Sequence, residues 1–164
     1  MAQHILWDAS GLVKRYYDET GRETVNAVFA AVSIRQMHIT PTGYAETYSI
    51  LLRKHNGGIL DRRTFTEATN ALRTEVVEDA DFGILSITDT LVFGSLSLMQ
   101  AHNINSADAA ILATYLQFQA SSPIPCRLAS ADKRLLRAAQ AEGLPSLNPE
   151  ETAASTVAGM LTRD

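Results

Sequence analysis

The sequence predicts an α/β fold, a three-layer α/β/α sandwich around a central parallel sheet. Short apolar runs at 5–7, 37–40, 82–88 and 126–130 are typical of strands, and amphipathic patterns of helical period separate them. Strands that alternate with helices form parallel sheets covered on both faces. The length of 164 residues, with 46% hydrophobic and 20% charged residues, is that of one globular domain.

The N-terminal half contains the first two strands and four helical segments. Ile5-Leu6-Trp7 is an apolar run that ends at Asp8, as a buried strand would. Pro41 stops the second strand, and Thr42 is then a suitable helix cap. The helices are predicted at 10–17, at 23–32, from Thr42 to His55 before Asn56-Gly57-Gly58, and after the cap Asp61 with Phe65, Ala68, Leu72 and Val76 at core spacing.

The C-terminal half continues the alternation. Leu91, Val92, Leu98 and Met99 indicate one helix, and Ser106 is predicted to cap the next. The remaining elements are a helix at 133–142 before Gly143, a short edge strand at 145–147 and a last helix that Pro149 opens at its first turn. The whole chain, 1–164, is predicted to be a single domain, with 150–164 as its C-terminal helix.

Composition and charge exclude several classes of protein. The chain has no apolar stretch long enough to cross a bilayer and no secretory signal at its start, so no membrane association and a cytoplasmic location are expected. Its single cysteine, Cys126, excludes an intramolecular disulfide framework and a multi-cysteine zinc site. The net charge of −4 argues against a protein that coats nucleic acid by charge alone. It argues less against a nuclease, because bound cations reverse the local charge of an acidic pocket.

Four acids stand where a predicted strand ends or a predicted helix begins: Asp8, Glu46, Asp108 and Asp132. Each has a simpler explanation, since an acid near a helix N-terminus stabilises the helix dipole by ~0.3–1 kcal/mol. Asp8 is harder to explain in this way, because an acid that abuts a buried strand is desolvated at a cost unless it has a partner. Ligands of open parallel sheets bind beyond the carboxyl ends of the strands, where Asp8 and Asp132 are expected.

If the four carboxylates converge, a hard divalent cation would relieve their repulsion. Such an ion can lower the pKa of a bound water and stabilise charge on a phosphate in the transition state. Spacing alone does not show that they converge.

Four segments in order resemble PIN-domain ribonucleases: ILWDASGLVKRYYDE, TPTGYAETYSILLRK, INSADAAILATYL and CRLASADKRLLRAAQAEGLPSLNP. They fall in order along residues 4–149, and the last resembles the family most closely. The resemblance implies a Mg²⁺- or Mn²⁺-dependent RNA-cleaving site in which Asp8, Glu46, Asp108 and Asp132 are the catalytic, metal-binding acids. Ser10 and Ser130 match the hydroxyl positions that support these acids. Asn103 and Asn105 lie where some members carry a further acid, so the resemblance does not settle a second metal.

The resemblance also implies partners. Compact bacterial members are VapC-type toxins, commonly homodimers, each inhibited by a VapB-like antitoxin. Basic residues flank three of the acidic segments and could hold phosphates of the RNA substrate, with Lys14 and Arg15 as the preferred RNA-binding pair. The other candidates are Arg53, Lys54, Lys133 and Arg134. Ordinary solvated helix faces explain these residues equally well.

Rival functions fit less well. A hydrolase with an Asp nucleophile after its first strand needs a second Asp two residues later, where this chain has Ser10. A receiver domain needs a paired acid and a lone lysine at a late strand end, and the phosphate-binding loop of NTPases is absent. The main alternative is a non-catalytic PIN-like module that binds RNA or a protein.

Overall fold

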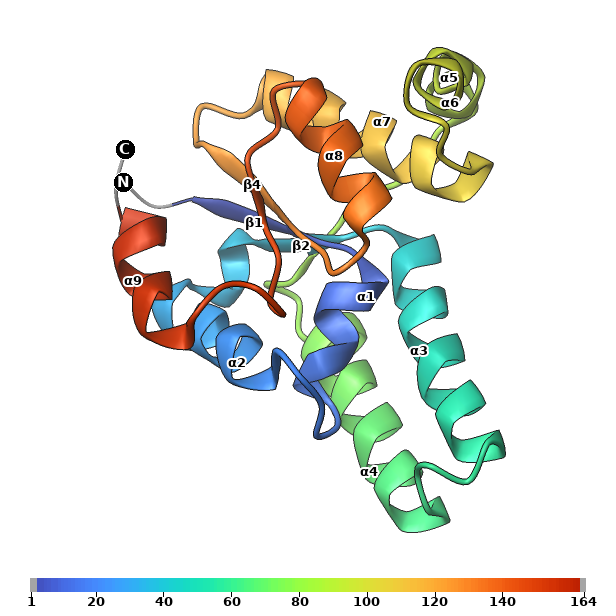
Figure 1. Cartoon of the computed structure of the whole chain (residues 1–164), viewed down its shortest axis with the longest axis vertical. Coiled ribbons are helices and arrows are strands. Elements are labelled where there is room, and N and C mark those ends of the chain that lie inside the picture. The colour runs from blue at the N-terminus through green and yellow to red at the C-terminus, as the bar shows by residue number, and fades with distance from the viewer. Residues whose placement is uncertain (1–2, 163–164) are drawn as a thin grey trace.

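The computed structural model describes residues 3–162 and contains a five-stranded parallel sheet in the order β3-β2-β1-β4-β5 (Figure 1). Helices cover both faces of the sheet, so the predicted three-layer α/β/α fold is confirmed. The strands are β1 (His4–Trp7), β2 (Met37–Ile39), β3 (Gly83–Ile84), β4 (Cys126–Ala129) and β5 (Ser146–Leu147). The helices are α1 (Ala9–Leu12), α2 (Arg22–Ala31), α3 (Pro41–Asn56), α4 (Arg62–Arg73), α5 (Asp89–Gly94), α6 (Leu96–His102), α7 (Ser106–Ser121), α8 (Lys133–Ala141) and α9 (Ala154–Thr162).

Strand β1 lies at the centre of the sheet and is buried on both faces. Ile5 and Trp7 belong to a core cluster shared with α2, α3 and α9, whereas Leu6 points to a second cluster shared with α7 and α8. A strand buried on both sides reads as a continuous apolar run, which explains the Ile-Leu-Trp segment. The hydroxyl of Tyr115 on α7 donates to the Trp7 carbonyl at 2.5 Å and fixes the end of β1.

Two predicted helix starts are wrong by one or two residues. Thr40, not Thr42, caps α3, because its Oγ1 accepts the Gly43 N–H at 3.0 Å and Pro41 occupies the first helical position, where no N–H is needed. Asn105, not Ser106, caps α7 by accepting the Asp108 N–H at 2.8 Å. The predicted cap Asp61 is confirmed.

Two other segments differ from the prediction. The strand expected at 82–88 shortens to β3, because the chain leaves the sheet after Leu85 and Thr88 already caps α5. The helix after Pro149 begins only at Ala154, because the Asn148 carbonyl accepts two N–H groups of the following turn. Helix α9 then packs on α2 through buried Val157 and Leu161.

Parallel pairing brings the carboxyl ends of the strands to one edge of the sheet. Asp8 follows β1 directly, α3 begins two residues after β2, and Ser130 follows β4. Asn148 occupies the corresponding position after β5. Within residues 3–162, no helix is long and apolar enough to cross a membrane.

Candidate functional site

Asp8 is fixed at the junction of β1 and β4. Its backbone N–H donates to the Ala129 carbonyl at 3.0 Å, and its own carbonyl accepts the N–H groups of Gly11 and Leu12. The residue therefore caps α1 while it still belongs to the end of β1. Its exposed fraction is 5%, so its carboxylate is almost removed from solvent.

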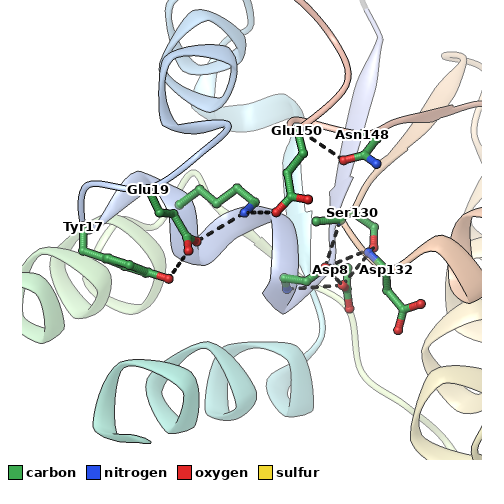
Figure 2. Close-up of polar contacts among 10 residues, drawn as sticks. Asp8, Tyr17, Glu19, Ser130, Asp132, Asn148 and Glu150 are labelled. Carbon is green, nitrogen blue, oxygen red and sulfur yellow. Dashed lines mark hydrogen bonds and ion pairs between the residues drawn. The ribbon is translucent and has the colours of Figure 1, made fainter. Parts of the chain in front are cut away.

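Two serine hydroxyls hold the Asp8 carboxylate from opposite chain segments (Figure 2). Ser10 Oγ donates to Asp8 Oδ2 at 2.5 Å, and Ser130 Oγ donates to the same oxygen at 3.0 Å. Ser10 Oγ accepts the Ala131 N–H at 2.9 Å, and Ser130 Oγ accepts the Asp132 N–H at 3.0 Å. The serines thus tie the loop after β1 to the loop after β4.

Glycine at position 11 permits this close approach. A Cβ on Gly11 would lie 2.6 Å from the Ala129 carbonyl oxygen and 3.3 Å from the Ser130 Cα. These are backbone atoms, which cannot move aside as a flexible side chain does. The motif Asp-Ala-Ser-Gly therefore combines an acid, its hydroxyl donor and the residue that lets α1 touch β4.

Asp132 and Asp108 each lie in the first turn or at the cap of a helix. Asp132 caps α8, where its Oδ1 accepts the N–H groups of Arg134 at 2.8 Å and Leu135 at 3.2 Å. Asp108 lies in the first turn of α7, and Asn105 Nδ2 donates to its Oδ2 at 2.7 Å. Both acids are half-buried. The two bonds of Asp132 Oδ1 are those of an acid that stabilises a helix N-terminus. Its Oδ2 has no hydrogen bond to a described residue.

The remaining acid, Glu46, projects from the second turn of α3 and is exposed. Desolvation raises its pKa, and the charges of Asp8 and Asp132 raise it further, whereas Arg53 one to two turns later lowers it. Glu46 therefore lies within electrostatic reach of two of the other acids.

The four acids form one electrostatic cluster. The pKa of Asp108 is raised to about 6, first by burial and then by the charges of Asp8, Asp132 and Glu46. Burial also raises the pKa of Asp8 against the lowering effect of its serine hydrogen bonds, and Asp132 adds to the rise. Folding therefore brings carboxylates separated by more than a hundred residues to the same edge of the sheet.

The chemistry of the donor set fits a hard divalent cation, because all four groups offer carboxylate oxygen and no His or Cys stands among them. In the described part of the chain, however, no group of three or more His, Cys, Asp or Glu side chains is placed to form a closed ligand shell around a metal ion. A cation that keeps several of its waters suits such a set better than one held entirely by protein.

Lys14 and Arg15, the predicted RNA-binding pair, form ion pairs within the protein. Lys14 is 3% exposed, and its Nζ binds Glu150 at 2.7 Å and Glu19 at 3.3 Å (Figure 2). Arg15 pairs with Glu75 at 2.9 Å and lies over the Phe29 ring. Both residues lie in the single 3-10 turn that follows α1 (Val13–Arg15), and their side chains contact acids of the protein itself.

Sequence analysis noted Asn105 only as a residue that stands where some family members carry a further acid, and it missed Asn148. Asn105 stands three residues before Asp108, the spacing of a capping residue and its target, which was a usable signal. Asn148 is 8% exposed, and only the fold shows that it stands beside Ser130 at the ends of β5 and β4.

The PIN domain family model matches residues 5–141 of this chain. The chain belongs to the PIN domain family. Proteins of this family are generally nucleases and typically use divalent metal ions. No curated protein matches the chain in sequence.

Solved structures share the fold at low sequence identity. PAE2754 from Pyrobaculum aerophilum is 19% identical, covers 97% of this chain and 99% of its own, and superposes with a TM-score of 0.61. VapC20 of Mycobacterium tuberculosis, described as a toxin that cleaves the sarcin-ricin loop, is 14% identical over 82% of this chain and 94% of its own, with a TM-score of 0.60. A chain of a toxin-antitoxin complex from Klebsiella pneumoniae is 18% identical over 90% of this chain and 99% of its own, with a TM-score of 0.58.

Proposed function

We propose that this PIN domain is a Mg²⁺- or Mn²⁺-dependent endoribonuclease, the toxin of a VapBC-type toxin–antitoxin pair, acting in the cytoplasm. The observation that carries the proposal is the cluster of four acids, in which burial and the neighbouring carboxylates raise the pKa values of Asp8, Glu46 and Asp108. Folded proteins hold such carboxylates together at a cost, which makes the cluster a candidate for function rather than for stability. The fold shared with VapC20 and with the Klebsiella pneumoniae complex supports the toxin assignment.

In this proposal Asp8, Asp108 and Asp132 position the cation, and Glu46 holds it directly or through water. The bound cation would supply an activated water and charge stabilisation at the phosphate. Ser10 and Ser130 orient Asp8 and oppose the rise in its pKa, because their hydroxyls donate to its Oδ2, whereas its Oδ1 has no hydrogen bond to a described residue. Asn105 orients Asp108 in the same way.

The test is cleavage of RNA by purified protein that has been freed of any bound inhibitor. Asp8→Asn and Asp108→Asn are expected to abolish cleavage with the fold retained, because each removes a charged oxygen ligand and keeps the side-chain shape. Glu67→Gln, which neutralises an exposed acid on α4, is the matched control and should cleave like the wild type. EDTA should silence the wild type, and Mg²⁺ or Mn²⁺ should restore it. Full activity of either Asn variant, or activity indifferent to chelator, would refute the assignment.

The alternative is a non-catalytic PIN-like module that binds RNA or a protein. The absence of a preformed group of three or more metal-ligating side chains among the described residues favours it. RNA binding without cleavage at any tested Mg²⁺ or Mn²⁺ concentration would decide for the alternative.

The proposal includes a homodimer and an antitoxin as partners. Large apolar side chains are exposed on two helix pairs, which is typical of interaction surfaces. On α5 and α6 they are Val92, Phe93 and Leu96, and around α3 and α4 they are Tyr48, Leu52 and Ile59. Light scattering on the protein alone and with its co-expressed antitoxin tests both. A monomeric mass for the protein alone would contradict the homodimer. Failure of the co-expressed antitoxin to form a complex with it would contradict the toxin–antitoxin pairing.

A further inference from the structure

Lys14 and Arg15 pair with acids of the protein itself, so an anionic substrate beside the acids would have to contact other basic side chains. Two exposed basic side chains of α8 are placed for this contact. Lys133 follows Asp132 directly, and Arg137 lies one turn later. Four residues of α-helix rise about 6 Å, so the two cations can reach one phosphate or two neighbouring ones. Within residues 3–162, Arg137 has no ion pair or side-chain hydrogen bond.

These cations lie at a pocket of about 320 Å³ between α8 and the chain that follows β5. One wall is the face of α8 that carries Lys133, Leu136, Arg137 and Gln140, and the other contains Leu147, Asn148 and Glu151. The volume falls within the range of small-ligand sites. Its apolar floor and polar rim are the composition expected where an oriented polar group binds.

Asn148 provides the second, independent observation. Its Oδ1 accepts the Glu150 N–H at 3.0 Å, which fixes the orientation of the amide. Nδ2 therefore points away from Glu150 (Figure 2), and no described group accepts its hydrogens although the residue is 8% exposed. A buried donor without an acceptor is costly, so this position calls for an oxygen-bearing group.

One contact in the pocket opposes an anion. Lys133 pairs with Glu151 at 3.0 Å, but both side chains are more than 60% exposed. A surface pair of this kind contributes little stability, so a phosphate can replace Glu151 as the partner of Lys133. The pocket then offers two cations and an amide donor to an anion.

We propose that this pocket binds a backbone phosphate of the RNA strand adjacent to the one held at the acids. The inference rests on the proposed function for its substrate and assigns the RNA contact to α8 and the end of β5. A strand whose cleaved phosphate lies among carboxylates needs cations at its flanks, and the α8 pocket begins one residue from Asp132.

The experiment measures the affinity of a labelled single-stranded RNA oligonucleotide in EDTA, as a function of salt. Arg137→Gln is expected to weaken binding about tenfold, the low end for a hydrogen bond to a charged group. It should also reduce the slope of log K against log salt by about 0.7, the value for one lost phosphate contact on a single strand. Arg62→Gln removes the same charge from the exposed start of α4 and should change neither quantity.

Asn148→Asp tests the amide. It keeps the acceptor for Glu150 and replaces the free donor by a negative oxygen, so it should weaken RNA binding more than Arg137→Gln does. A carboxylate at this buried position also lowers stability, so binding is compared at a temperature where thermal melts show that both variants are folded. Amide NMR of the wild type should show the Asn148 side chain shifting with RNA at concentrations where inorganic phosphate alone has no effect.

The outcomes separate this inference from the proposed function. RNA binding that depends on Arg137 and Asn148 without any metal-dependent cleavage would refute the function and keep the pocket. If the wild type cleaves RNA in a metal-dependent way but Arg137→Gln binds RNA as tightly as Arg62→Gln does, the pocket is refuted and the proposed function stands. Undetectable RNA binding by the wild type, or an Asn148 response to inorganic phosphate and not to RNA, would also overturn it.

Discussion

Replacement of Gly11 by alanine tests how closely α1 must approach β4. In a helix, alanine is favoured over glycine by roughly 0.5–1 kcal/mol, so the intrinsic effect is stabilising. At this position, however, the new Cβ would lie 2.6 Å from the Ala129 carbonyl oxygen. Overpacking in a core costs roughly 1–3 kcal/mol, and here only backbone can yield. The backbone shift also stretches the bond from the Asp8 N–H to Ala129. We expect a net loss of about 2 kcal/mol in the free energy of unfolding.

Gly159→Ala is the matched control for this substitution. Gly159 lies in the exposed face of α9, and a Cβ there would meet nothing within 4 Å. It should gain about 0.5–1 kcal/mol, since only the helix preference operates. Urea unfolding followed by circular dichroism measures both variants, and equal slopes justify comparing their midpoints. A Gly11→Ala protein as stable as the wild type would refute the close packing of α1 on β4.

Two further substitutions test the electrostatics of the site. In EDTA and above pH 6, Asp108→Asn should be more stable than the wild type by about 1–2 kcal/mol. This is less than the ~3 kcal/mol that a shift of two pKa units represents, because the Asp108 side chain is partly exposed. The pKa of Asp108 is raised to about 6, so between pH 4 and 6 the folded state binds more protons than the unfolded chain, and the wild type loses stability as the pH rises. Urea titrations across pH 3–7 measure this, and parallel curves for the two proteins would contradict the clustering of the acids. Lys14→Met should lower stability by about 2 kcal/mol, because Glu19 and Glu150 lose a buried cation, yet leave the salt dependence of RNA binding unchanged. A smaller salt slope in this variant would restore Lys14 as an RNA contact.

The periodicity of apolar residues, together with the helix-capping, proline and glycine positions, predicted most of the fold. The apolar runs of β1 and β4 are buried on both faces, and burial is what makes such runs continuous. The errors fall at element boundaries, where one hydrogen bond decides between neighbours: Thr40 and Thr42 are the same residue type, and only the bond to Gly43 distinguishes them. The late start of α9 has the same origin, because the carbonyl of Asn148 holds the preceding turn.

The positions of the acids in the proposed site follow from local sequence more readily than the directions of its basic side chains. An acid that follows an apolar strand has its position set by the strand, so the placement of Asp8 follows from local sequence. The direction of a lysine side chain depends on tertiary partners. Glu150, which binds Lys14, is 136 residues away in sequence, and no local pattern near Lys14 announces it. Whether a basic residue serves the substrate or the fold is therefore decided by long-range packing.

The same long-range packing separates charge into two regions on either side of Asp132. On one side, carboxylates raise one another's pKa values and repel a phosphate unless a cation intervenes. On the other, the exposed bases of α8 would attract it without a cation. A chain with a net charge of −4 can therefore still bind an RNA strand, because the sign that the strand meets is set by the α8 surface and by the cation, and not by the total. It follows that metal and RNA should bind cooperatively here, each reducing the electrostatic cost that the other would otherwise meet.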